Sequence, residues 1–342
     1  MKKHRLTAYI LAILALSACS EHKHHHNTAA TEVPPTTIGF VVARNDHNSP
    51  YLQKVYQTAE QAKQSIPNLT LLLENAEGSV DKQYAHLDKM IEQGAKALII
   101  NLVDGSKGGE YIKKYCGKVP LVFYVINPGD KNMAACEDAY FVNSDPAQGS
   151  VALGLSILEN WKKNPQWDKN KDGKIQLAIM DAFPAQAHTK SRGDWVISTI
   201  ENYPVLNTKA QILLTGIGRF QTNVAEETAN KWITDPTFEQ VEVIVSSADS
   251  MSYGIVNAMQ KNQKATTPLF SVNRLTPTEA MIKNGQIVDS IETDFYHEVS
   301  AAMQLAMNLA NKQPLTQGLD YHIYDKQLLV PFIVSNNNQA NQ

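Results

Sequence analysis

The sequence predicts an α/β protein built of two lobes, each a doubly wound parallel sheet covered by helices. From Ile38 onwards, short apolar segments alternate with amphipathic segments of helical period, and this alternation begins afresh after about residue 145. Near-continuous apolar strands separated by helices are typical of parallel sheets that are buried on both faces. A length of 342 residues, 43% of them hydrophobic, is sufficient for two separate cores.

The first half contains about five predicted strands with helices between them. In the first predicted helix, 50–66, the apolar residues Leu52, Val55 and Ala59 share one face. A second predicted helix, 81–94, stops at Gly94. A third helix is expected near 108–117. The predicted strands are 38–43, 69–75, 97–103, 119–125 and 139–143.

The second half repeats this organisation, beginning with a long predicted helix over 146–164. The predicted strands that follow are 175–181, 210–216, 241–247, 268–273 and 286–292. Ligands of open parallel sheets bind beyond the carboxyl ends of the strands. Two such sheets that face each other therefore predict a ligand cleft between the lobes.

Common catalytic and nucleic-acid-binding signals are missing from the sequence. Gly216 and Gly218 follow a predicted strand but lack the third glycine of a dinucleotide-binding turn. No GxSxG elbow, HExxH motif or Walker-type loop occurs. The formal net charge is −3 and no basic block follows the N-terminus, which argues against a nucleic-acid partner. The sequence thus favours a binding protein over an enzyme.

The N-terminus reads as an export signal. Lys2, Lys3 and Arg5 precede the apolar run 6–16, which is too short to span a bilayer. The run ends in Leu-Ser-Ala-Cys and resembles a bacterial lipobox, so residues 1–19 are expected to be a lipoprotein signal with Cys19 as the lipidated residue. The alternative is an ordinary signal with an incidental cysteine. The polar segment 20–36 is expected to be a flexible tether.

Two cysteines remain in the exported part of the chain, Cys116 and Cys136. An oxidising compartment permits a disulfide between them, because each lies shortly before a predicted strand and neighbouring strands could bring them together. Two buried free thiols are the alternative.

A calcium loop is the most specific chemical motif of the sequence. In the segment Asp-Lys-Asn-Lys-Asp-Gly-Lys-Ile-Gln, side-chain oxygens recur at relative positions 1, 3, 5 and 9, with glycine at position 6. Calcium takes several oxygen ligands, and the glycine allows the loop to turn them inwards. The expected ligands are Asp168, Asn170, Asp172, the carbonyl of Lys174, and Gln176.

The loop departs from an EF-hand at its end. Position 12 would be Ile179, so the bidentate carboxylate must come from elsewhere, and Glu242 at the start of the strand 241–247 is the candidate. A solvated turn without an ion is the alternative. Because no catalytic group accompanies the loop, the calcium is expected to be structural.

With these segments together, the chain resembles the periplasmic galactose/glucose-binding proteins of sugar ABC transporters. The likeness extends from about Ile38 to Ile333 and is carried by 96–104, 119–125, 167–176, 241–256 and 330–334. It implies a type I binding fold with a three-strand hinge. The implied N-terminal lobe is 37–144 plus 294–328, and the C-terminal lobe is 145–293 plus 329–342. The family holds calcium with the same nine-residue loop and a later glutamate, as at Glu242.

The resemblance also implies a sugar pocket, in which this chain differs from the family. The residues on or beside the family's contact positions are His47, Asn127, His188, Arg192, Phe220, Asp249, Asn273 and Thr293. Asp249 can equally act as a helix cap. His47, His188 and Asn273 replace acidic residues of the family. We therefore do not expect this chain to bind glucose or galactose in the way that the family does. Arg192 with the two histidines suits a carboxylate or phosphate, and a polyol or another sugar is also compatible.

The resemblance implies the substrate-binding component of an ABC importer, working as a monomer by hinge closure. Its partners would be a small, sugar-like ligand, a permease with its ATPase and, as a further candidate, a chemoreceptor. A lipoprotein that senses a ligand and signals without transport is the alternative. The protein is expected in the periplasm, held to the membrane only by lipid. Ser20 after Cys19 favours the outer membrane.

Overall fold

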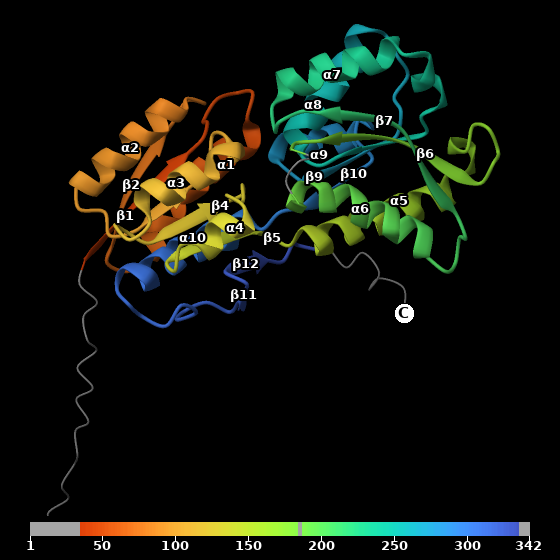
Figure 1. The fold of residues 1–342 in the computed structure, drawn as a ribbon. Helices are drawn as coiled ribbons and strands as arrows, with labels where there is room; N and C mark the ends of the chain where they lie inside the picture. Colours follow the sequence, from red (N-terminus) through yellow and green to blue (C-terminus); the bar gives the residue numbers. More distant parts are fainter. Residues whose placement is uncertain (1–34, 184–186, 335–342) are drawn as a thin grey trace, which may run out of the picture. The chain divides into compact units, whose positions relative to one another are not determined.

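The structure, a computed structural model, describes residues 35–183 and 187–334, and the backbone alone for 187–192. Within these ranges the strands form two separate sheets (Figure 1). The predicted fold class of two parallel-sheet lobes is confirmed. In the described part of the chain, no helix is long and apolar enough to span a bilayer.

The first sheet has the strand order β11-β12-β5-β4-β3-β1-β2 and is parallel except for β11. Its strands are β1 (Thr36–Val42), β2 (Leu69–Asn75), β3 (Leu98–Ile100), β4 (Leu121–Tyr124), β5 (Ala139–Ser144), β11 (Ile323–Tyr324) and β12 (Gln327–Val330). The helices of this lobe are α1 (Pro50–Ala62), α2 (Val80–Glu92), α3 (Gly108–Tyr115), α4 (Asp130–Ala134) and α10 (Phe295–Ala310), with short 3-10 turns at Lys63–Ser65 and Gly105–Lys107.

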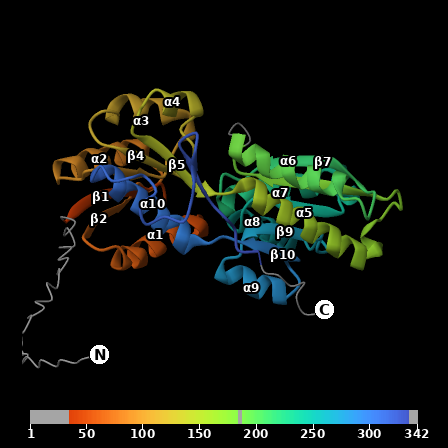
Figure 2. The same ribbon diagram turned by 90° about the horizontal axis from the view of Figure 1, so that it is seen from below.

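Helices cover both faces of this sheet. Helices α1 and α10 pack together on one face, and α2 and α3 lie on the other, as the right-handed connections of parallel strands require (Figures 1 and 2). Strands β1, β3 and β4 carry fully buried apolar side chains, among them Phe40, Ile99 and Phe123. The core of the first lobe therefore lies on both sides of the sheet, as expected for near-continuous apolar strands.

The second sheet has the order β10-β9-β8-β6-β7 and is parallel throughout. Its strands are β6 (Lys174–Asp181), β7 (Lys209–Ile217), β8 (Val243–Ser246), β9 (Leu269–Asn273) and β10 (Asp289–Glu292). The helices are α5 (Pro146–Lys163), α6 (Ala187–Asn202), α7 (Thr222–Thr234), α8 (Asp249–Lys261) and α9 (Thr276–Lys283), with 3-10 turns at Pro165–Trp167 and Pro236–Gln240. Helices α5 and α6 pack on one face, and α7 and α8 on the other (Figure 1).

Over the described residues the chain passes between the lobes three times. The first passage follows β5 at Ser144, the second lies between β10 and α10, and the third follows β12. Leu329 and Val330 pair with Asn143 and Ser144 of the first sheet. The third passage therefore lies two residues later than the predicted lobe boundary after residue 328, because these apolar residues complete the β12 ladder.

Candidate binding site at the carboxyl ends of the strands

The carboxyl ends of β1, β3 and β4 are fixed to one another by a buried amide. Asn101, directly after β3, is fully buried; its Oδ1 accepts the amide of Ala43 at 3.0 Å, and its Nδ2 donates to the carbonyl of Tyr124 at 3.1 Å. The next residue after β4, Val125, has φ 67°. A β-branched residue in the left-handed region is strained and persists only where its surroundings hold it. The strand ends of the first lobe thus form a rigid rim.

The second lobe shows the same kind of backbone after β7 and β9. Arg219 and Phe220 have φ values of 52° and 56°, and Asn273 and Arg274 have φ values of 114° and 49°. Such conformations in residues other than glycine gather at functional sites, where strain is tolerated to aim side chains. Both lobes therefore hold strained loops at the ends of the strands where ligands of parallel sheets bind.

Several buried polar atoms in these regions have no hydrogen-bond partner in the structure. They are Oγ of Ser49 before α1, both amide atoms of Asn143 in β5, Oγ of Ser250 in α8, and Oδ1 of Asn273 at the end of β9. Each of the four residues is at most 2% exposed. A buried polar group left unpaired costs about 1–3 kcal/mol. These hydroxyl and amide groups are therefore the strongest candidates for ligand contacts.

The predicted ligand residues Asn273 and Thr293 lie together. Asn273 Nδ2 donates to Thr293 Oγ1 at 3.0 Å, and both residues are buried. This bond fixes the amide so that its Oδ1 is left free for a further donor. The pair joins the end of β9 to the second passage between the lobes.

Phe220 is also buried, but its ring contacts other aromatic rings of the protein. Its centroid lies 5.9 Å from that of Tyr51 in a near-parallel stack, and 5.8 Å from that of Phe183 in an edge contact. Tyr51 belongs to the first lobe, and the amide of Thr222 in the second lobe donates to the carbonyl of Asn48 at 2.9 Å. Phe220 thus lies at a contact between the lobes.

Asp249 was predicted as a ligand contact or a helix cap. It is the first residue of α8, whose N-cap position is Ala248, so the cap reading is wrong. Asp249 is fully buried, and its carboxylate accepts four hydrogen bonds within the second lobe. The donors are Ser271 Oγ at 2.6 Å, Ser290 Oγ at 2.7 Å, the amide of Leu275 at 2.7 Å and Thr278 Oγ1 at 2.6 Å. Burial raises the pKa of Asp249 although these donors oppose the shift. Asp249 therefore joins β9, α9 and β10 inside the lobe.

The remaining predicted ligand residues have different positions. Asn127 is engaged locally, because its Oδ1 accepts the amide of Gly129 at 2.7 Å and its Nδ2 donates to Asp130 at 3.2 Å. His47 is exposed to solvent. The side chains of His188 and Arg192 lie outside the described residues, as does Cys19.

The predicted calcium loop is a compact turn at the amino end of β6. Gly173 has φ 73°, the left-handed conformation that this position of the loop requires. Asp168 accepts the amides of Asp172 and Gly173, and Asp172 accepts the amide of Lys174 at 2.9 Å. The side chains predicted as ligands thus turn towards the inside of the loop.

Glu242 is held beside this loop. Its two carboxylate oxygens accept the amides of Lys169 at 2.7 Å and of Gln176 at 3.1 Å. Burial is the main cause that raises the pKa of Glu242, and the negative charges of Asp168 and Asp172 raise it further. The two hydrogen bonds from backbone amides lower the pKa and so oppose this shift. Gln176 Oε1 is buried without a partner. An unpaired oxygen beside three carboxylates is a donor set that fits a hard cation.

No group of three or more His, Cys, Asp or Glu side chains in the described ranges meets the geometry of a metal site. A calcium loop of this type also uses amide oxygens and a backbone carbonyl. The calcium site therefore stays a prediction, supported by the residues present.

Cys116 and Cys136 form a disulfide with a Cα–Cα distance of 5.8 Å. It joins the end of α3 to the segment between α4 and β5. Lys326 stabilises the same segment, since its Nζ donates to the carbonyls of Cys136 at 2.5 Å and Glu137 at 2.8 Å. These contacts lie at the amino end of β5, away from the rim described above.

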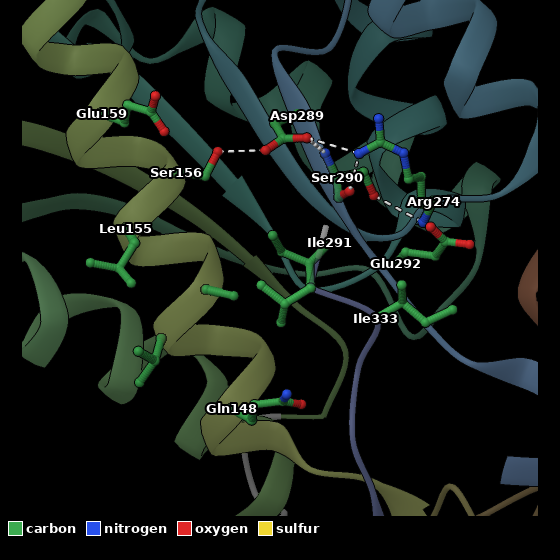
Figure 3. A pocket seen from close by; sticks show the side chains of 13 residues that line it. Gln148, Leu155, Ser156, Glu159, Arg274, Asp289, Ser290, Ile291, Glu292 and Ile333 are labelled. Carbon is green, nitrogen blue, oxygen red and sulfur yellow. Dashed lines mark hydrogen bonds and ion pairs between the residues drawn. The ribbon is translucent and has the colours of Figure 1, made fainter. Parts of the chain in front are cut away.

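A separate pocket of about 390 Å³ lies between α5, β10 and the segment around Ile333 (Figure 3). Arg274 projects into this region and is bonded to Glu279 at 2.7 Å and to Asp289 at 3.1 Å. None of the predicted ligand residues lines it. The guanidinium of Arg274 is already paired, and two further acidic residues, Glu159 and Glu292, line the pocket. The pocket therefore does not offer a positive site for an anion.

Sequence reasoning did not single out Asn143 or Ser250. A polar residue at the end of an apolar strand, as in Phe-Val-Asn-Ser, was the available signal for Asn143. Ser250 follows Asp249 at the start of a helix, in a sequence that resembles an ordinary helix cap. Only its burial, which the sequence does not show, distinguishes Ser250 from a serine of such a cap.

Comparison with known proteins agrees with this architecture. Residues 38–314 match the model of the periplasmic binding protein domain. The chain belongs to the periplasmic binding protein family. This is a family of solute-binding proteins rather than enzymes, and its members are periplasmic.

This binding protein is 26% identical over 334 residues to the D-galactose/methyl-galactoside binding periplasmic protein MglB of Haemophilus influenzae, covering 97% of this chain and 96% of the relative. The resemblance to galactose/glucose-binding proteins is thereby confirmed. A solute-binding protein of Actinobacillus succinogenes with bound D-allose has a TM-score of 0.68 and 17% identity, covering 87% and 96% of the two chains. One from Bacillus halodurans with bound myo-inositol has a TM-score of 0.66 and 16% identity, covering 87% and 93%.

Proposed function

We propose that this protein is the substrate-binding lipoprotein of an ABC importer and that it holds a neutral monosaccharide or cyclic polyol between its lobes. The observation that carries this proposal is a set of unpaired buried hydroxyl and amide groups in both lobes. Asn143 and Asn273 lie at the ends of β5 and β9, and Ser49 and Ser250 lie at the starts of the helices that follow β1 and β8. Hydroxyls and amides both donate and accept, as the hydroxyls of a sugar do.

An anionic ligand is less well supported. Of the three residues expected to favour an anion, His47 is exposed to solvent. The buried groups without partners at the rim are uncharged. A related protein binds D-galactose or methyl-galactoside by name, and two similar folds hold D-allose and myo-inositol. These ligands are uncharged and rich in hydroxyls.

Ligand binding would work by closure about the three passages. A ligand that contacts both lobes stabilises the closed state by its differential affinity for the two states. The closed protein would then be recognised by a permease with its ATPase. Lipidation at Cys19 would keep the protein at the membrane, with residues 20–36 as the tether.

A thermal-shift screen tests the proposed ligand class. The panel comprises D-galactose, D-allose, myo-inositol, galacturonic acid and galactose 6-phosphate. A neutral compound is expected to raise the melting temperature, because a ligand that binds only the folded state stabilises it. Stabilisation by the charged compounds alone would contradict the proposal.

Asn273→Ala tests the proposed contact. It removes a buried acceptor and is expected to weaken binding of the stabilising sugar about tenfold or more. Asn284→Ala is the matched control, because Asn284 is an exposed asparagine of the same lobe. Equal affinities of the two variants would show that Asn273 makes no ligand contact.

We further propose that Asp168, Asn170, Asp172, Lys174, Gln176 and Glu242 hold a structural calcium ion, Lys174 through its carbonyl. The ion would neutralise the crowded carboxylates and satisfy Gln176 Oε1. Added Ca²⁺ should raise the melting temperature of EGTA-treated protein, and Glu242→Gln should reduce this rise. Asp235→Asn, at the half-buried cap of the 3-10 turn Pro236–Gln240 in the same lobe, should leave the rise unchanged. A melting temperature that does not respond to Ca²⁺ would refute the assignment.

A further inference from the structure

A buried carboxylate occupies the point where the chain re-enters the first lobe. Glu298 lies in the first turn of α10, directly after the second passage, and is fully buried. Its Oε2 accepts a hydrogen bond from Ser144 Oγ. Its Oε1 accepts a longer hydrogen bond from Tyr51 Oη, at 3.4 Å. A buried carboxylate is retained only where such donors compensate its desolvation.

Ser144 connects Glu298 to the other two passages. It is the last residue of β5, after which the chain first leaves the lobe, and it pairs with Val330 at the end of β12. The amide of Asp145 donates to the carbonyl of Val330 at 2.9 Å. The bond between Ser144 and Glu298 therefore fixes the β5–β12 ladder to the start of α10, which brings all three passages into one network.

Tyr51 connects Glu298 to the contact between the lobes. The Tyr51 ring stacks on Phe220 of the second lobe, and its centroid lies 5.3 Å from that of Phe295, the first residue of α10. Tyr124 is also fully buried; burial first, and then the charge of Glu298, raise the pKa of its hydroxyl well above the usual value.

We propose that Glu298 is a positioning residue of the hinge, which fixes the three passages to one another on the first-lobe side and orients Tyr51 towards Phe220. Opening and closing would then pivot about a rigid base. The use of this hinge in ligand binding rests on the proposed function, but the network itself does not.

Hydrogen–deuterium exchange of the intact, ligand-free protein tests the proposal. The reporters are the amides of Asp145 and Ile333, which donate to Val330 and Glu292 across the passages. The amide of Leu98, which donates to Pro120 within the sheet, is the internal reference. Glu298→Ala should accelerate exchange at the two reporters about tenfold or more and leave Leu98 nearly unchanged.

Two further variants separate a hinge role from general destabilisation. Gln83→Ala removes a fully buried side chain of the same lobe that bonds to Asn101, Val103 and Tyr111. It should lower the melting temperature without selective acceleration at Asp145 and Ile333. Glu298→Gln keeps one acceptor oxygen and should restore much of the protection.

The proposal is overturned if Glu298→Ala leaves the two reporter amides unchanged, or if Gln83→Ala accelerates them equally. These outcomes do not depend on a sugar. Should the wild-type protein bind none of the panel, the proposed function would fail while the exchange data still decide the role of Glu298.

Discussion

Removal of the disulfide should destabilise the first lobe by an amount that follows from its position in the chain. Cys116 and Cys136 are separated by 20 residues. Closing a loop of about this length removes chain entropy from the unfolded state worth about 3 kcal/mol at 25 °C. The double variant Cys116→Ser, Cys136→Ser should lose about this free energy of unfolding.

Urea denaturation followed by circular dichroism measures this loss. The midpoint should fall in the double variant, with a melting temperature lower by roughly 5–10 °C for a lobe of this size. Wild-type protein treated with a reductant should behave like the variant. An unchanged midpoint for both the variant and the reduced protein would mean that the crosslink does not restrict the unfolded chain, and the expected stabilisation would then be absent.

Three other substitutions have definite expected outcomes. Gly254→Ala places a Cβ 2.2 Å from the carbonyl oxygen of Thr222, where α7 and α8 pack, and should destabilise by about 1–3 kcal/mol in urea titrations. Asp249→Ala leaves four buried donors without their acceptor and should cost about 3 kcal/mol or more. Asp235→Ala, which removes the half-buried cap of the 3-10 turn Pro236–Gln240, should cost about 1 kcal/mol, and equal losses in urea titrations would contradict the structural role of Asp249. Lys326→Met removes a charged donor to the carbonyls of Cys136 and Glu137 and should lower stability by about 1–3 kcal/mol, measurable by calorimetry.

Most strands and helices were predictable because apolar residues follow one period over each of them. The segment 69–75 forms β2 with the expected bounds, and 50–66 contains α1 followed by a 3-10 turn. The strands β11 and β12 were not predicted. They are only two and four residues long, and β12 is defined by its pairing with the distant β5. The periodicity of a short segment does not predict that it pairs with a distant strand.

The site was less predictable than the fold, because burial and partners depend on distant segments. Asp249 resembles a helix cap in the sequence, yet it is the first residue of α8 and its four partners come from positions 271–290. Phe220 was predicted as a ligand contact, but its stacking on Tyr51, more than a hundred residues earlier, could not be predicted from the sequence. Asn273 and Thr293 were predicted separately, and the fold brings them within one hydrogen bond.

Isothermal titration calorimetry with the sugar selected by the screen compares wild-type protein with Asn273→Ala. The wild-type protein should bind one molecule of an uncharged sugar or polyol per chain, and the affinity of the variant should be about tenfold or more lower. Absence of binding by every neutral compound, or identical affinity in both proteins, would rule out a sugar site at Asn273 and the neighbouring buried polar groups.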